Sequence, residues 1–174
     1  VSSHREENVD NEQNLTDLIE TLGALVKEYN YPIIFSTHPR TELRLRSITK
    51  TRINPKIVFS KPFGFFDYIK LQKNAFCTLS DSGTITEESS ILKFPAVTIR
   101  DQHERPEGMD EGTLIMCGLK KDAVLDAINV TTKQNSHDIK IVEDYDVARV
   151  SKKIVKIILS YTNYINRNIW KKDV

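Results

Sequence analysis

The sequence predicts an α/β fold in which helices cover both faces of a parallel sheet. Two observations lead to this class. Short apolar runs alternate along the chain with amphipathic stretches of helical length. The apolar runs are also nearly continuous, which is typical of parallel strands buried on both faces. Alternating strands and helices favour a parallel sheet, because each return to the sheet needs a crossover connection.

The first half of the chain predicts two helices and two strands. Residues 14–28 carry leucine, isoleucine and valine at helical spacing, which indicates an amphipathic helix. The run YPIIFSTH at 31–38 is apolar, has a proline near its start and ends in polar residues, as strands do. We expect a second helix over 40–50 and a strand at KIVFS, residues 56–60.

The second half continues the alternation. A short helix over 66–73 leads to the strand AFCTLS, and a helix over 84–93 ends before Pro95. The strands AVTIR and GTLIMCG follow, and then a helix over 122–132. A long helix over 147–164 places valine and isoleucine on one side.

Composition excludes several classes of protein. The 174 residues hold 25 basic and 24 acidic side chains, which argues against binding to long nucleic acid. No run approaches the roughly 20 apolar residues of a membrane span, and no signal peptide is visible, so we expect a cytoplasmic protein. Cys77 and Cys117 are expected as buried free thiols, and neither they nor the four histidines show metal-ligand spacing. We therefore expect no metal and no cofactor.

Four loops follow the predicted strands, and ligands of such sheets bind outside the carboxyl ends of the strands. These loops are at 36–40, at 80–83, at 100–112 and, at the start of the chain, at 2–8. The opening VSSHREENV reads as the end of a strand entering a loop, and we expect the chain to be part of a longer protein.

The stretch SDSGTITEE allows two interpretations. Gly83 lets the backbone approach a ligand, the free N–H groups of the helix start favour a phosphate, and Ser82 adds a hydroxyl donor. A carboxylate of Glu87 or Glu88 could then accept both hydroxyls of a ribose. The alternative is a serine N-cap followed by glutamates that complement the helix dipole. These residues alone favour neither.

The loop RDQHERPEGMDEGT is the more informative one. An arginine held by neighbouring carboxylates presents a preorganised fork to a diphosphate. The alternative is a solvated loop with weak surface ion pairs. The length of this loop, with its proline and glycine residues, favours function. His38 follows a predicted strand, and His4 lies in the loop at the start of the chain. A single histidine is more often structural than functional.

Together SHREEN, STHPRT, SDSGTITEE and RDQHERPEGMDEGT resemble the carboxyl-terminal half of the non-hydrolysing UDP-N-acetylglucosamine 2-epimerases. The resemblance covers residues 1 to about 130, and the long terminal helix fits as well. It implies one half of a glycosyltransferase-B architecture, with residues 1–174 as the Rossmann-like UDP-binding domain. The helix over 147–164 would pack toward an amino-terminal domain.

The resemblance also implies roles for single residues. Ser82, Gly83 and the backbone of Thr84 would hold the diphosphate. Glu88 would bind the ribose hydroxyls, and Arg105 would neutralise the charge of the diphosphate. The segment 62–68, which ends at Tyr68, would border the uracil. His4 matches a histidine near the diphosphate and the reacting sugar, and is a catalytic candidate with Arg105. Arg5 and His38 match positions that contact a second, regulatory UDP-sugar in some members. Thr84 stands where a second glycine is common.

The implied reaction eliminates UDP across C1 and C2 of a UDP-N-acetylhexosamine and adds it back with the opposite configuration at C2. The general base would come from the amino-terminal domain, so this chain alone is expected to bind UDP weakly without turnover. The partners implied are a UDP-sugar, that domain and a second subunit of a homodimer. The role implied is synthesis of capsular or cell-surface polysaccharide precursors, among them UDP-N-acetyl-L-fucosamine.

Three alternatives stay open. A UDP-sugar glycosyltransferase of the same fold often carries a second glutamate eight residues before the ribose-binding one, where this chain has Ser80. A hydrolysing epimerase would release the free sugar. A non-catalytic nucleotide-binding module would need no second domain.

Overall fold

The chain divides into two compact units, residues Val1–Val142 and Glu143–Val174. The computed structural model describes residues 1–47, 53–102, 104–135 and 139–172. His103 and His137, two of the four histidines without metal-ligand spacing, lie outside the described residues, as does the end of the expected helix over 40–50.

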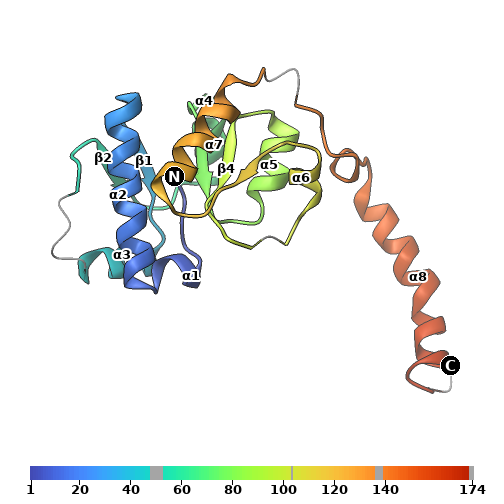
Figure 1. The fold of residues 1–174 in the computed structure, drawn as a ribbon. Coiled ribbons are helices and arrows are strands. Elements are labelled where there is room, and N and C mark those ends of the chain that lie inside the picture. Colours follow the sequence, from blue (N-terminus) through green and yellow to red (C-terminus); the bar gives the residue numbers. More distant parts are fainter. Residues whose placement is uncertain (48–52, 103, 136–138, 173–174) are drawn as a thin grey trace. The chain divides into compact units, whose positions relative to one another are not determined.

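A parallel sheet forms the centre of the first unit (Figure 1). Ser2 makes parallel bridges to both Ser36 and Ser80, so the amino-terminal residues lie between two groups of strands. The resulting order is β2, β1, the amino-terminal segment, β3, β4 and β5. The strands are β1 (Ile33–Ser36), β2 (Ile57–Ser60), β3 (Thr78–Ser80), β4 (Ala96–Thr98) and β5 (Ile115–Met116).

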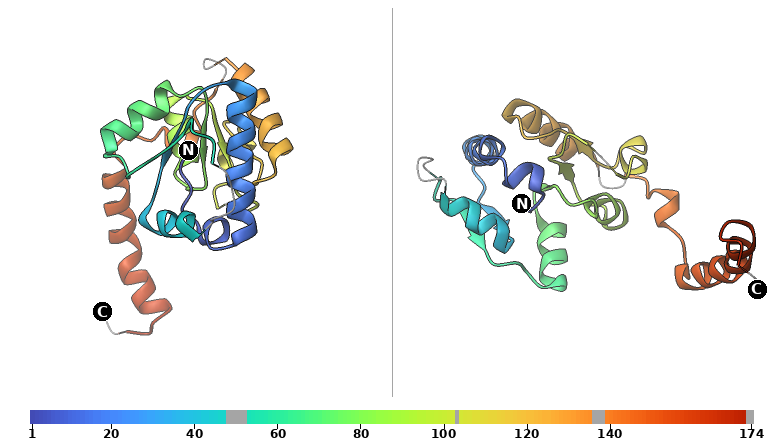
Figure 2. Two further views of the ribbon diagram at one scale, coloured as in Figure 1. Left: turned by 90° about the vertical axis from the view of Figure 1, so that its left-hand side faces the viewer. Right: turned by 90° about the horizontal axis from the view of Figure 1, so that it is seen from below.

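Helices cover both faces of this sheet, as Figure 2 shows. On one face lie α2 (Glu12–Tyr29) and α7 (Lys121–Lys133), and on the other α4 (Phe65–Asn74) and α5 (Ile85–Leu92). The helix α3 (Pro39–Ser47) connects β1 to β2. The start of α2 is capped by the Asn11 side chain, which accepts hydrogen bonds from two backbone N–H groups.

The main core lies between the sheet and the pair α2 and α7. The helical spacing of apolar residues in α2 puts Leu15, Leu18, Ile19, Leu22, Leu25 and Val26 on this face. They pack with Phe35, Val97 and Ile99 of the sheet strands and their ends, and with Val124 and Ile128 of α7. A smaller cluster around Ile85 and Phe94 fixes α5. Burial of this apolar surface is the main force that holds the sheet and helices together.

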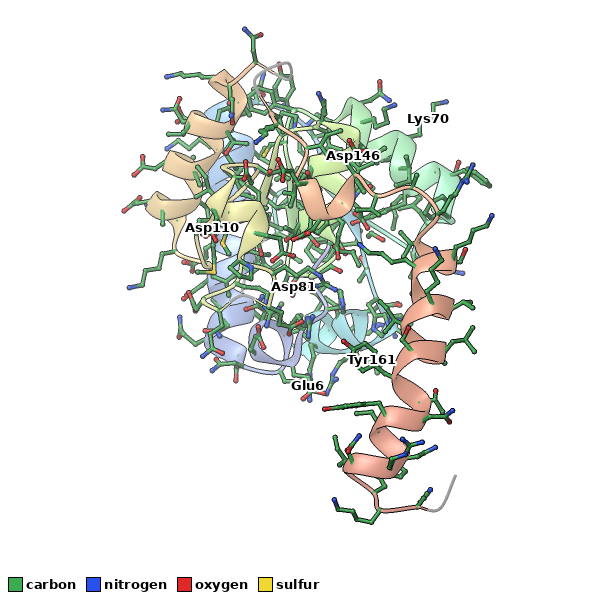
Figure 3. The ribbon with its side chains drawn as sticks, turned by 90° about the vertical axis from the view of Figure 1, so that its right-hand side faces the viewer. Glu6, Lys70, Asp81, Asp110, Asp146 and Tyr161 are labelled. Atoms are coloured by element: carbon green, nitrogen blue, oxygen red, sulfur yellow. The ribbon has the colours of Figure 1, made fainter. Side chains whose placement is uncertain are left out.

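The second unit consists of the 3₁₀ turn Glu143–Tyr145 and the helix α8 (Val150–Asn168). The apolar side chains of α8 are exposed, among them Ile154 and Ile158. Tyr161, which Figure 3 labels, is exposed as well. Within the part of the chain that is described, no helix combines the length and the apolar character needed to cross a membrane.

Every strand and long helix expected from the sequence is present, with ends that differ by a few residues. The short helices α1 (Glu6–Val9) and α6 (Glu107–Asp110) were not expected, because four residues carry no periodic pattern. The expectation that AFCTLS is buried on both faces holds for Thr78–Ser80 but not for Phe76, whose side chain is 44% exposed. The two cysteines are free, as expected, but half-buried.

Replacing Leu22 with alanine should lower the free energy of unfolding by about 2–5 kcal/mol, because it leaves a cavity between α2 and the sheet. The side chain of Leu22 is fully buried. Leu43, which is 69% exposed on α3, is the matched control, and Leu43→Ala should change the free energy by less than about 0.5 kcal/mol. Urea denaturation measures both, and equal effects would contradict this assignment of the core.

Candidate functional site

The candidate site lies at the carboxyl ends of the central strands. The amino-terminal segment lies between β1 and β3 in the sheet. The chain continues from this segment to β1, on one side, and reaches β3, on the other side, only later. This is the switch point of the strand order, where two loops leave in opposite directions and open a crevice. The loops are residues 3–8 and the turn 81–84.

Asp81 joins these two loops. Its carboxylate is completely buried in the first unit (Figure 3) and directly follows β3. It accepts hydrogen bonds from the Ser3 hydroxyl at 2.7 Å, from the backbone N–H groups of His4 and Arg5 at 3.0 Å, and from the Asn8 amide at 3.1 Å. A buried carboxylate needs such donors, since an unpaired charge in the interior is costly. The amino-terminal loop is therefore folded around one side chain of the opposite loop.

Further contacts fix the same loop from both sides. The Asn8 amide also donates to the Ile99 carbonyl at 3.1 Å, at the end of β4. The Thr41 hydroxyl of α3 donates to the Ser3 carbonyl at 2.8 Å. The buried Arg100 donates through Nε to Glu7 at 2.9 Å. The loop is thus bonded to the ends of three strands or their following helices.

His4 and His38 lie together at this end of the sheet. The His4 Nδ1 atom is 3.4 Å from the Asp81 carboxylate, and the two imidazole ring centres are 6.1 Å apart. Arg5 leaves the loop in another direction, with Nη1 3.6 Å from the Glu104 carboxylate. From the sequence the two histidines were separate candidates, and the fold brings them together.

The turn after Asp81 presents unpaired backbone donors. The N–H groups of Ile85 and Thr86 bond to the carbonyls of Ser82 and Gly83 at 3.3 Å. Across the described residues no partner is formed for the N–H groups of Gly83 and Thr84. The residue that precedes α5 is Thr84, and no side chain caps the helix, so the alternative interpretation of a serine N-cap is wrong. An exposed helix start with free donors can accept an anion.

Arg105 lies directly against this turn. A Cβ atom added to Gly83 would overlap the Arg105 Nη1 atom, so a larger residue here would displace the guanidinium from its place against the turn. The Arg105 Nε atom is 2.7 Å from the Glu87 carboxylate. The arginine is therefore held by a carboxylate, as the sequence indicated, but this carboxylate belongs to α5 and not to the loop of Arg105.

A small hollow of about 20 Å³ is lined by residues of the turn 81–84 and of the loop that follows β4. Ser82 and Gly83 line it on one side, and Arg100, Gln102, Glu104 and Arg105 on the other. Two arginines and Gly83, whose N–H group is free, therefore line one hollow. Such a set of donors can bind a diphosphate.

Glu88 lies on the side of α5 that faces α4. Its carboxylate accepts a hydrogen bond from the Gln72 amide at 2.5 Å, and Gln72 is buried. The Tyr68 hydroxyl lies beside the hydroxyls of Ser2 and Ser80. Burial, together with the negative charge of Glu88, raises the pKa of Tyr68 above its usual value of 10, so that it is a neutral donor.

Two positioning residues, Asp81 and Gln72, were not expected from the sequence, and Glu87 was considered for a ribose but not as the partner of Arg105. Asp81 stood inside the quoted motif, and its polar side chain at the end of a buried strand was the available signal. Gln72 carried no signal, since it falls within an ordinary helix. Among the described residues, no group of three histidine, cysteine, aspartate or glutamate side chains could hold a metal ion.

Comparison with known proteins identifies the family. A family model described as UDP-N-acetylglucosamine 2-epimerase matches residues 1–159. The chain belongs to the UDP-N-acetylglucosamine 2-epimerase family. The curated UDP-N-acetylglucosamine 2-epimerase of Methanocaldococcus jannaschii is 40% identical over 133 residues, which cover 75% of this chain and 36% of that protein.

Solved structures of the epimerase family share the fold. The UDP-N-acetylglucosamine 2-epimerase of Rickettsia bellii is 49% identical, with a TM-score of 0.82 over 98% of this chain and 46% of its own. The M. jannaschii enzyme in complex with UDP-GlcNAc and UDP is 34% identical, with a TM-score of 0.83 over 91% of this chain and 44% of its own. The chain thus spans less than half the length of these epimerases. The expected fold class, half of a glycosyltransferase-B architecture, is confirmed.

Replacing Asp81 with asparagine should lower the free energy of unfolding by about 2–4 kcal/mol, because an amide brings an N–H donor against the donors of the loop. Amide exchange of His4 and Arg5 should also accelerate. Asp67→Asn on the exposed start of α4 is the control and should leave both unchanged. Urea denaturation and hydrogen exchange measure these effects, and exchange at His4 equal to that of the native chain would show that Asp81 does not hold the loop.

Proposed function

We propose that this chain supplies the UDP-binding half of a UDP-N-acetylhexosamine 2-epimerase. The observation that carries the proposal is the guanidinium of Arg105 lying on Gly83, beside the free N–H groups of the turn. Ser82, Gly83 and the Thr84 backbone would hold the diphosphate, and Arg105 would neutralise its charge. The family and the complex of the M. jannaschii relative with UDP-GlcNAc and UDP support this substrate class.

The nucleoside would lie along α4 and α5. Glu88 would accept the ribose hydroxyls, and its bond to Gln72 would hold the carboxylate in place. Tyr68 would border the uracil together with the rest of segment 62–68. A diphosphate at the turn and a ribose at Glu88 fit one nucleotide, because the turn leads directly into the first turn of α5, which carries Glu88.

In the reaction, a base removes the C2 proton of the sugar while the C1–oxygen bond breaks, which gives a 2-acetamidoglycal and UDP. UDP then returns to C1, and a proton is delivered to the opposite face of C2. The negative charge that builds on the departing diphosphate would be stabilised by Arg105, the turn and His4, as catalytic groups that act through preorganised electrostatics. The base would come from an amino-terminal domain.

We further propose that residues 1–174 form the carboxyl-terminal domain of this enzyme, which would act in the cytoplasm as a homodimer on polysaccharide precursors. The helix α8 supports a second domain. Its apolar side chains are about half exposed in the second unit, and we propose that they pack on the amino-terminal domain. Arg5 and His38 would contact a regulatory UDP-sugar.

Replacing Glu88 with glutamine should weaken UDP binding about tenfold, because the side chain keeps its bond to Gln72 but loses the charge that orders both ribose hydroxyls. The control is Glu20→Gln on the exposed face of α2, which should bind UDP as the native chain does. Isothermal titration with UDP measures the affinities. Equal affinity for the Glu88 variant and the native chain would remove Glu88 from the site.

Residues 1–174 by themselves should bind UDP and leave UDP-N-acetylglucosamine unchanged in deuterium oxide, since the base that removes the C2 proton would be absent. Proton NMR of the sugar C2 position measures the exchange. The same residues joined to the amino-terminal domain of the R. bellii relative serve as the positive control. Deuterium at C2 with residues 1–174 alone would contradict the proposed division of roles.

A further inference from the structure

Two side-chain hydroxyls meet at the turn 81–84. The Ser82 Oγ atom is 3.0 Å from the Thr84 Oγ1 atom, so one hydroxyl donates a hydrogen bond to the other. Among the residues that the structure describes, neither hydroxyl has a second partner. Each hydroxyl carries one hydrogen, so one hydrogen joins the two oxygens and the other is unused. The pair therefore has one donor left for a ligand.

The backbone of Thr84 allows its side chain to make this pair. Its φ of −67° and ψ of −15° are helical, a conformation that a β-branched residue adopts without strain. A threonine at the start of a helix often caps the helix with its hydroxyl, but Thr84 makes no such hydrogen bond. The Thr84 hydroxyl is thus bonded to Ser82 instead of to the backbone of α5.

Ser82 has one donor to offer a ligand, which is its hydroxyl. Its backbone N–H is already bonded to the Ser80 hydroxyl at 3.1 Å. Ser82 lines the small hollow together with Gly83 and Arg105, whereas Thr84 does not line it. Of the two paired residues, Ser82 is therefore the one beside the proposed diphosphate, and Thr84 lies behind it.

An anion in the hollow sets the direction of the hydroxyl pair. The oxygens of a diphosphate accept hydrogen bonds, so the Ser82 hydroxyl must donate its hydrogen to them. Ser82 then has no hydrogen for Thr84, and the contact between the two oxygens persists because Thr84 donates to Ser82. Hydrogen bonds in such a chain polarise one another, which strengthens the bond from Ser82 to the anion.

We propose that the Thr84 side chain is a positioning residue for the diphosphate, because its hydroxyl donates to Ser82 and orients the Ser82 hydroxyl toward the phosphate oxygens. The inference rests on the proposed function, in which Thr84 contributes only its backbone. The two side chains would act as one unit, so the effects of removing them on UDP affinity should not add.

The substitution Thr84→Val keeps the branched shape of the side chain and removes its hydroxyl. In the 174-residue chain it should weaken UDP binding about threefold. Binding of uridine, which has no phosphate, should stay unchanged. Thr84→Ser restores the hydroxyl and should bind UDP within about twofold of the native affinity. Isothermal titration with UDP and with uridine measures the affinities.

The matched control is Thr16→Val on α2. The Thr16 hydroxyl bonds to the Glu12 carbonyl of its own helix at 2.8 Å, away from the candidate site. This variant should bind UDP and uridine as the native chain does. Unchanged UDP affinity of Thr84→Val would overturn the proposal, and so would a Thr84→Ser variant that binds as weakly as Thr84→Val.

A double variant separates positioning through Ser82 from a direct contact of Thr84. Ser82→Ala should weaken UDP binding about tenfold, because a hydrogen bond to a charged group is lost. Ser82→Ala combined with Thr84→Val should bind no more weakly than Ser82→Ala alone. A further loss of about threefold in the double variant would contradict the proposal, because Thr84 would then act without Ser82. A native chain that binds UDP no more tightly than uridine would refute the proposed diphosphate site, and this role of Thr84 with it.

Discussion

The buried carboxylate of Asp81 is the constraint on which the arrangement of the site depends. It accepts hydrogen bonds from the loop at residues 3–8, which carries His4 and Arg5, while it belongs to the turn that begins α5. A buried charge of this kind contributes to stability through its hydrogen-bond partners, because removing the carboxylate or its donors leaves polar groups unpaired in the interior. The two loops of the crevice therefore keep one relative position.

Other charged groups of the site are held in a similar way. Glu87 bonds to Arg105 at 2.7 Å, and the buried Gln72 bonds to Glu88 at 2.5 Å. The guanidinium is bound through its Nε atom, which leaves the Nη groups beside Gly83 for an anion. Preorganised donors of this kind cost little reorganisation when charge develops on a ligand. The polar framework of the site is thus held in place by contacts within the chain itself.

Much of the fold could be predicted from the sequence, because apolar runs and helical periodicity report directly on burial. The candidate residues Ser82, Gly83 and Arg105 could also be predicted, and the fold brings them together. The contacts of Asp81, Gln72 and Glu87 could not be predicted, since each joins residues that are not neighbours in the sequence. Asp81 meets its loop across 73 to 78 residues, and no local pattern encodes such a contact. The opening of the chain was read as the end of a strand, and the bridges of Ser2 agree with this, but its place between β1 and β3 could not be predicted because two residues carry no periodicity.

The central claim is that the turn after Asp81 and the guanidinium of Arg105 form one diphosphate site. A crystal structure of the chain with UDP tests this most directly. The account predicts phosphate oxygens within hydrogen-bonding distance of the Gly83 and Thr84 N–H groups and of Arg105, with the ribose at Glu88. UDP bound elsewhere, with Arg105 directed away from the phosphates, would contradict it.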